Sequence, residues 1–430
     1  MKPNILYIHS HDTGRYIQPY GHAVPTPALQ RLAEEGVLFR QNFCVQPTCS
    51  PSRAALLTGC YPHENGMTGL AHRGFALHDY GQHVLHTLRK AGYVSALAGV
   101  QHIATPTEDK APWQVIGYDQ WLGNAGRDGA VAFLEQAPDE PFFLAVGFNE
   151  THRGFPPLED SPDDPRYCLP PAPLPDTPET RADMTRYKAS ARILDQQIGD
   201  VLDALARSGK ADNTLVICTT DHGIPFPHMK CNLTDHGIGV MLIMHGPGGF
   251  TGGKAVDAMT SHLDIFPTIC EVAGIDKPDW LRGKSLLALV ADEPQALHEE
   301  LFFEVNFHAA YEPLRAVRTT RWKYVKRFDG RETPVLANCD GGESKTLRVE
   351  QGWKERNIDE EMLFDLLFDP NEANNLVGHS GYATILTDMR ARLERWMHET
   401  HDPLLSGVVP APVGARLNDP DDLSPSQRKG

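Results

Sequence analysis

Short apolar runs alternate with amphipathic segments through the first part of the chain. We expect strands at residues 5–8, 93–98, 142–146, 215–218 and 240–244, and helices at 27–35, 84–91, 183–206 and 263–273. Strands that are apolar along their whole length and separated by helices are typical of a sheet covered on both faces. The pattern therefore predicts an α/β sandwich with a large, mostly parallel central sheet between helices.

The pattern changes after residue 300. Alternating polar and apolar positions indicate short antiparallel strands, and a later segment has apolar residues at helical spacing. The strands are expected at 301–304, 314–318 and 322–325, and the helix at 383–396. We therefore divide the chain into a large domain (1–300), a smaller C-terminal α+β subdomain (301–402) and an extended tail (403–430). The proline-rich stretch 156–178 has no periodicity and is expected to be a long surface excursion.

The composition narrows the class of partner. The chain has 430 residues and a formal net charge of −16, which argues against nucleic acid because phosphate binding needs a basic surface. A small anionic ligand stays compatible, because it responds to the local field of its site. No apolar run approaches the length of a membrane span, so no membrane partner is expected. The first predicted strand follows Met1 almost directly, which predicts a cytoplasmic protein if Met1 is the natural start.

Acidic and imidazole side chains follow two of the predicted strands. His11-Asp12 comes after the first strand, and Asp221-His222-Gly223 follows the strand at 215–218. Ligands in open α/β sheets collect at the carboxyl ends of strands, so these side chains are expected to bind a divalent metal. The same three letters recur at Asp235-His236-Gly237, but this copy precedes a strand, so we expect a turn there.

Cys49 opens the most specific motif of the chain. Eight cysteines are scattered without zinc-type spacing, and the seven others are expected to be reduced packing residues. From Cys49 to Gly59 the sequence follows the pattern C-x-P-x-R-x-x-x-x-T-G. Pro51 suits a first helical turn, so Cys49 is expected at a helix N-terminus, where main-chain N–H groups and the dipole favour anions.

This motif resembles the signature of the type I sulfatases, a family of the alkaline phosphatase superfamily. The resemblance implies an alkaline-phosphatase-like fold, one divalent metal, and a maturation enzyme that oxidises Cys49 to formylglycine. Further segments align over nearly the whole chain. Gly99-Val100-Gln101-His102 resembles the family's Gly-Lys-x-His segment, and Asn149–Arg153 its histidine-bearing segment. Lys230 has the spacing of the sulfamidase-like (N-sulfoglucosamine sulfohydrolase-like) branch.

The resemblance implies a role for each candidate residue. The catalytic residues are formylglycine at Cys49 as nucleophile, Arg53 and Lys230 as anion-binding cations, and His102 and His152 in proton transfer. The metal ligands are Asp12, Asp221, His222, residue 49 and, where the family has its first aspartate, His11. Val100 replaces the family's lysine, so Arg53 and Lys230 are expected to supply more positive charge, or Gln101 a neutral hydrogen bond. Calcium is favoured, with manganese, magnesium and zinc as alternatives, because imidazole suits transition metals.

These features predict a hydrolase of sulfate esters or sulfamates, including those of sulfated sugars, with residues 1–300 as its sulfatase catalytic domain. Two alternatives stay open. The Asp221-His222 pair and the missing lysine at position 100 also suit a phosphonate monoester or phosphodiester hydrolase on the same fold. An unmodified Cys49 would make the chain a metal-binding pseudoenzyme. The expected partners are a small anionic substrate and the formylglycine-generating enzyme, and a homo-oligomer is left open.

Overall fold

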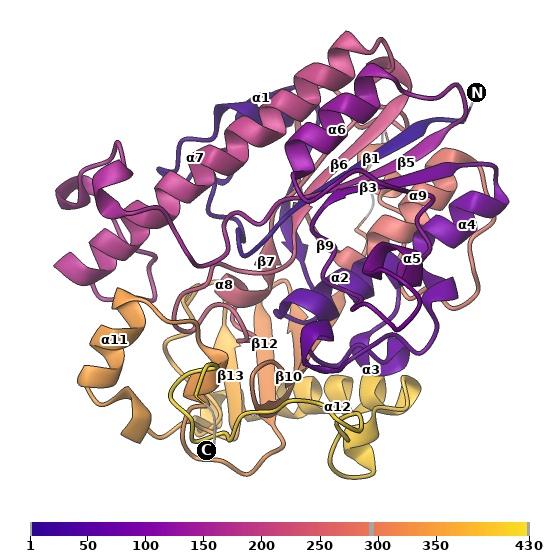
Figure 1. The fold of residues 1–430 in the computed structure, drawn as a ribbon. Helices are drawn as coiled ribbons and strands as arrows, with labels where there is room; N and C mark the ends of the chain where they lie inside the picture. The colour runs from indigo at the N-terminus through magenta and orange to yellow at the C-terminus, as the bar shows by residue number, and fades with distance from the viewer. Residues whose placement is uncertain (1, 292–295, 428–430) are drawn as a thin grey trace.

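The structure, a computed structural model, describes residues 2–291 and 296–427, and within them the central feature is a sheet of nine strands (Figure 1). These are β1 (Asn4–Ser10), β2 (Val37–Phe43), β3 (Val94–Gly99), β4 (Gln120–Trp121), β5 (Phe142–Gly147), β6 (Thr214–Thr220), β7 (Gly239–Val240), β8 (Leu242–His245) and β9 (Lys254–Ser261). The order is β4-β3-β5-β1-β6-β8-β2-β7, with β9 paired to β2. β1 lies between two parallel neighbours, β5 and β6, whereas β8 runs antiparallel to both of its own. The predicted sandwich with a mostly parallel sheet is confirmed.

Helices cover both faces of this sheet (Figure 1). One layer comprises α1 (Pro27–Glu35), α6 (Gly126–Glu135) and the long α7 (Pro178–Arg207), and the other α2 (Cys49–Thr58), α4 (Val84–Lys90), α5 (Pro112–Ile116) and α9 (Ile265–Ala273). Short helices connect these elements: α3 (Pro62–Asn65), α8 (Asp235–Ile238) and α10 (Leu287–Val290). β1 separates the two cores, because Leu6 and Ile8 point into one and Ile5 and Tyr7 into the other. This alternation is that of a strand buried on both sides.

A smaller antiparallel sheet packs against the large one. Its strands are β10 (Glu300–Phe307), β11 (Tyr311–Thr319), β12 (Trp322–Arg327) and β13 (Glu361–Asp365), in that order. One face shares a core with the large sheet through Phe43 and Phe303, and the other buries Leu393 and Trp396 of α12 (Ala383–Glu399). α11 (Glu343–Glu350) lies beside α7, where Arg186 pairs with Glu343. The predicted strands and helix of this region are present, and the domain boundaries at 300 and 402 stay predictions.

The sequence pattern does not predict β2 or β9, because polar residues interrupt both. In β2, Arg40 and Gln41 reach the surface between buried apolar ends, and pairing with β8 and β9 holds the strand in place. The single strand expected at 240–244 is two short strands. The reason is that the Met241 amide donates to the carbonyl of Gly14 at 2.8 Å and leaves the ladder.

Two irregular segments run over the surface. The excursion at 156–178 contains two short 3-10 turns, and the tail beyond 402 is tied to the body by main-chain bonds, such as that from Asn418 to the carbonyl of Ala309. The predicted tail's last residues, 428–430, lie outside the described residues. All eight cysteines are free and buried. Within residues 2–291 and 296–427, no helix is long and apolar enough to cross a membrane.

Candidate active site

The carboxyl ends of two neighbouring strands place two carboxylates side by side. β1 and β6 run parallel with Ser10 opposite Thr220, so the residues that follow each strand lie next to each other. Asp12 has a φ of 53°, in the left-handed region, and its main-chain amide donates to Asp221 Oδ1 at 2.8 Å. Both aspartates are buried. The sheet therefore fixes two like charges together in the interior.

The side chains around these carboxylates face one another. One ligand atom from each of four residues lies within 4.8 Å of the others: His11, Asp12, Cys49 and Asp221. His222 directs Nε2 at Asp12 Oδ1, 3.2 Å away, while its Nδ1 lies 3.0 Å from the carbonyl oxygen of Gly223. Since Nδ1–H donates to that carbonyl, Nε2 has a lone pair. A lone pair and a carboxylate oxygen this close repel each other unless a proton or a metal cation lies between them, and the nitrogen and oxygen donors present here fit a metal.

One polar atom without a partner supports this assignment. Asp12 Oδ1 is buried without a hydrogen-bond partner among the described residues, and His11 Nδ1 lies 3.2 Å from Asp221 Oδ2. A buried polar atom without a partner is rare and usually indicates an ion or a functional role. Burial lowers the pKa of His11 to about 4, and the charge of Arg53 acts in the same direction. His11 is therefore neutral at pH 7 and can offer a lone pair.

The charges of the cluster leave room for one more cation. Among its described residues, three carboxylates (Asp12, Asp221 and Asp340) face two permanent cations (Arg53 and Lys230). Lys230 Nζ lies 2.9 Å from Asp12 and 2.8 Å from Asp340. Burial opposes its charge, but the two aspartates raise the pKa of Lys230 well above its usual value. A divalent metal would make the cluster net positive, which suits an anionic substrate.

Cys49 begins α2, as predicted, with its side chain inside the cluster. Its Sγ lies 3.4 Å from His222 Nε2. Burial raises the pKa of the Cys49 thiol well above its ordinary value. A thiol with a raised pKa is a poor nucleophile because the thiolate is the reactive form. An unmodified Cys49 is therefore not suited to direct attack on a substrate.

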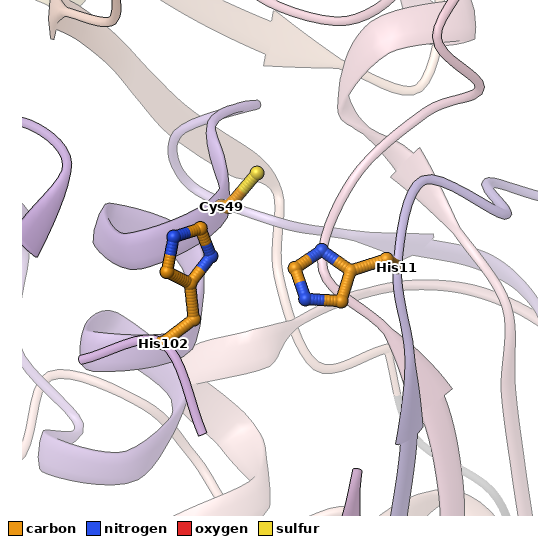
Figure 2. A group of neighbouring side chains, drawn as sticks. All are labelled: His11, Cys49 and His102. Atoms are coloured by element: carbon orange, nitrogen blue, oxygen red, sulfur yellow. The ribbon is translucent and has the colours of Figure 1, made fainter. Parts of the chain in front are cut away.

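The two histidines expected in proton transfer approach from separate loops. Figure 2 shows the His102 ring beside Cys49 and facing His11. The centroids of the His11 and His102 rings lie 5.4 Å apart. Burial lowers the pKa of His102 well below its usual value. His152 Nε2 lies 4.0 Å from Asp12 Oδ2, and 36% of its side chain is exposed. His152 thus stands between the buried cluster and solvent.

Arg53 is turned toward the strand ends. Its guanidinium donates to Asp221 Oδ2 at 2.9 Å, to the carbonyl of Ser10 at 2.8 Å, and to His9 Nδ1. Arg53 is fully buried, so these bonds anchor Asp221 as well as offset its charge. Anion binding by Arg53 stays a prediction. His9 has no distinguishing signal in the sequence, because a histidine within an apolar strand is more often a packing residue.

The Gln101 side chain is bonded within its own loop, and its hydrogen bond to an anion stays a prediction. Its amide nitrogen donates to the carbonyl of Ala104, and its amide oxygen accepts from the main chain of Ile103 and Ala104. The amide oxygen and one of the two amide N–H groups are used in holding this loop. Charge supplied by Lys230 and Arg53 in place of the family's lysine stays a prediction.

Sequence reasoning misses further residues at the site. Asp340, from the loop before α11, pairs with Lys230, and His308, at the end of β10, is buried close enough for Lys230 to affect its pKa. His72 stacks on His102 with centroids 5.3 Å apart. None of these residues lies in a recognisable motif, and tertiary packing alone brings them to the cluster.

The second Asp-His-Gly copy lies outside the cluster. Asp235 begins the one-turn helix α8 and accepts bonds from Arg318, and His236 contacts Tyr16 and Asn371. The expected turn is thus a short helix held by ion pairs. A third group of potential ligands, His63, Glu304 and Asp402, is occupied by Arg315, which pairs with both carboxylates.

Comparison with known proteins finds matches to sulfatase families. Residues 3–275 match the family described as Sulfatase, and residues 228–341 match the one described as N-sulphoglucosamine sulphohydrolase, C-terminal. Human N-sulphoglucosamine sulphohydrolase is 31% identical over 466 aligned residues, which cover 93% of this chain and 91% of the relative.

Solved structures share the fold at lower sequence identity. A putative sulfatase from Bacteroides thetaiotaomicron aligns with a TM-score of 0.74 at 22% identity, covering 100% of this chain and 99% of that one. The phosphonate monoester hydrolase of Agrobacterium radiobacter aligns with a TM-score of 0.68 at 21% identity, covering 94% and 97%. Because proteins with different names share this fold, the fold alone does not select the substrate.

The two Asp-His-Gly copies provide a matched pair of mutants for the metal site. We expect His222→Ala to lower manganese affinity by at least about 100-fold, since it removes the Nε2 that faces both aspartates. His236→Ala is expected to bind manganese normally, because its ring contacts Tyr16 and Asn371 instead. Isothermal titration with Mn²⁺ measures both. The reverse order of effects would place the metal at the second copy.

Proposed function

The chain belongs to the sulfatase family, and on this basis we propose that its buried cluster hydrolyses the sulfate esters or sulfamates of small sugars. The observation that supports this most is the set of donors around Cys49. Asp12, Asp221 and His222 face the first residue of α2 at the carboxyl ends of parallel strands. This is where an anion and a metal are both stabilised.

The proposed chemistry needs two groups beyond the encoded side chains. Formylglycine at position 49 would supply a hydrated aldehyde, whose two hydroxyls allow attack at sulfur and later release of sulfate. A divalent metal held by Asp12, Asp221, His222, residue 49 and His11 would polarise the sulfate oxygens and favour the deprotonated hydroxyl. In the cluster without a metal, burial raises the pKa of the Cys49 thiol and leaves the encoded side chain unactivated, which agrees with the first requirement.

The remaining side chains are proposed to bind the anion and move protons. Lys230 is buried and charged beside Asp12, so it can neutralise a sulfate oxygen without being desolvated again on binding. His102, on the Cys49 side, is neutral and can accept a proton from the hydrated residue. His152 has 36% of its side chain exposed, and we assign to it the protonation of the leaving oxygen or nitrogen.

The donor set favours a metal that accepts imidazole. His11 and His222 both face the cluster, whereas calcium prefers oxygen ligands throughout. We therefore propose manganese or zinc ahead of the calcium expected from the family. The human relative's name, N-sulphoglucosamine sulphohydrolase, makes an N-sulfated glucosamine the first substrate to test.

A substrate panel tests the proposed function. We expect turnover of glucosamine N-sulfate or an aryl sulfate to exceed that of an aryl phosphonate monoester in kcat/KM. The aryl phosphonate monoester is included in the panel because His222 and Val100 both depart from the sulfatase pattern. A preference of more than about 100-fold for the phosphonate, equal to about 2.7 kcal/mol of transition-state binding, would overturn the proposal.

Replacement of Cys49 by serine tests the need for the aldehyde. Cys49→Ser is expected to fold normally and to lose nearly all turnover. Serine has one hydroxyl, and a second hydroxyl on the same carbon is needed to expel the sulfate. The measurement is steady-state turnover of an aryl sulfate by protein from a host without a serine-oxidising maturase. Multiple turnovers at near wild-type rate would show that no aldehyde is required.

His11→Asp tests the origin of the metal preference. The change restores a carboxylate where the family has one, so it should raise affinity for Ca²⁺ relative to Mn²⁺. Isothermal titration of both ions against both proteins gives the ratio without an activity assay. An unchanged ratio would mean that His11 does not contact the metal.

A further inference from the structure

A hollow of about 970 Å³ opens beside the proposed catalytic cluster. His72 and Arg73 line one side, and residues 415–420, 422 and 425–427 of the C-terminal tail line the other. His72 joins the hollow to the cluster, because its Nδ1 lies 3.1 Å from His102 Nε2. A substrate whose sulfate reaches Cys49 would have to extend past His72 to place a second part in this hollow.

Arg73 holds the C-terminal tail in place through hydrogen bonds. Arg73 donates to the carbonyl of Arg416 and to Asn418 Oδ1, each at 3.0 Å, and to the carbonyl of Pro425 at 3.2 Å. The amide of Arg416 donates back to the carbonyl of Arg73 at 2.8 Å. These bonds hold the tail as a fixed wall of the hollow. Nη1 and Nη2 of Arg73 are both engaged in these bonds.

Arg416 is the exposed cation of that wall. Its guanidinium donates to the carbonyl of His72, which leaves most of its five N–H donors free of bonds to other described residues. Several cations lie near His72, while the lining of the hollow holds two arginines and two aspartates, Asp419 and Asp422. Burial lowers the pKa of His72, and Arg73, Arg416, His152 and Lys230 all lower it further.

The acidic residues of the hollow are engaged by the tail itself. Asp422 is buried and accepts from Asn418 Nδ2 at 2.9 Å and from the Asp419 amide at 3.1 Å. Asp419 accepts from the amide of Asp421 at 3.0 Å. These bonds satisfy carboxylate oxygens within the tail. The exposed donors of Arg416 are thus the groups best placed to meet a ligand.

We propose that Arg416 forms a second anion subsite, which binds a carboxylate or an additional sulfate on the sugar whose sulfate is cleaved at Cys49. The inference rests on the proposed function and adds the substrate class: a sugar with two anionic groups. A guanidinium suits either group, because its planar fork bonds carboxylate and sulfate oxygens in pairs.

Arg416→Gln tests the subsite in the Cys49→Ser background, where ligands bind without turnover. Isothermal titration uses three probes: glucosamine N-sulfate, glucosamine 2-N,6-O-disulfate, and a disaccharide of uronate and glucosamine N-sulfate. We expect affinity to fall about tenfold for one or both doubly anionic probes and to change less than about twofold for the singly sulfated one. The probe that responds identifies the second anion as sulfate or carboxylate.

Two further variants control for charge and for folding. Arg207→Gln removes an exposed arginine at the end of α7 and should leave all three affinities unchanged. Arg416→Lys keeps the charge without the fork and should retain part of the affinity. Thermal melting should be the same for all variants, because the Arg416 side chain is exposed.

Equal losses of affinity for all three probes on Arg416→Gln, or no loss for either doubly anionic probe, would contradict the proposed anion subsite. Failure of the proposed function has a different signature. In that case the wild-type protein would turn over no sulfate or sulfamate, while the doubly anionic probes would still lose affinity on Arg416→Gln.

Discussion

The site depends on two buried carboxylates that parallel strands force together. Asp12 and Asp221 follow β1 and β6 and share a hydrogen bond through the main chain, so neither can move away from the other. Like charges in a low-dielectric interior repel strongly, and removing one partner of a buried ion pair typically destabilises by about 3–5 kcal/mol. The pair persists because Arg53 and Lys230 are bonded to it. The position of His222 leaves space for a further cation.

The same constraint accounts for the proposed chemistry. Cations that offset buried carboxylates are already desolvated, so an arriving sulfate meets charges that need little reorganisation. Cys49 lies at this point because α2 begins there, and its thiol is kept protonated by burial. Burial lowers the pKa of His102 well below its usual value, and His152, the other residue of the predicted pair, has 36% of its side chain exposed.

The sequence predicts the parts of this arrangement that depend on local pattern. Apolar strands, the C-x-P-x-R motif and the acids after β1 and β6 are all visible in the chain, so the fold class and the cluster of Asp12, Asp221 and Cys49 follow from it. Strand β2 has a polar centre and is held by its neighbours, so its own residues do not reveal it. Asp340 reaches Lys230 and Arg416 reaches His72 from distant loops, where tertiary packing sets the position.

The most direct test of the account is the chemical state of residue 49 in active protein. Mass spectrometry of the tryptic peptide that contains Cys49 should be done on a preparation whose turnover of a sulfate ester or sulfamate has been measured. The account predicts the aldehyde mass, with the modified fraction rising in proportion to specific activity. A fully active preparation that contains only the unmodified thiol would contradict it.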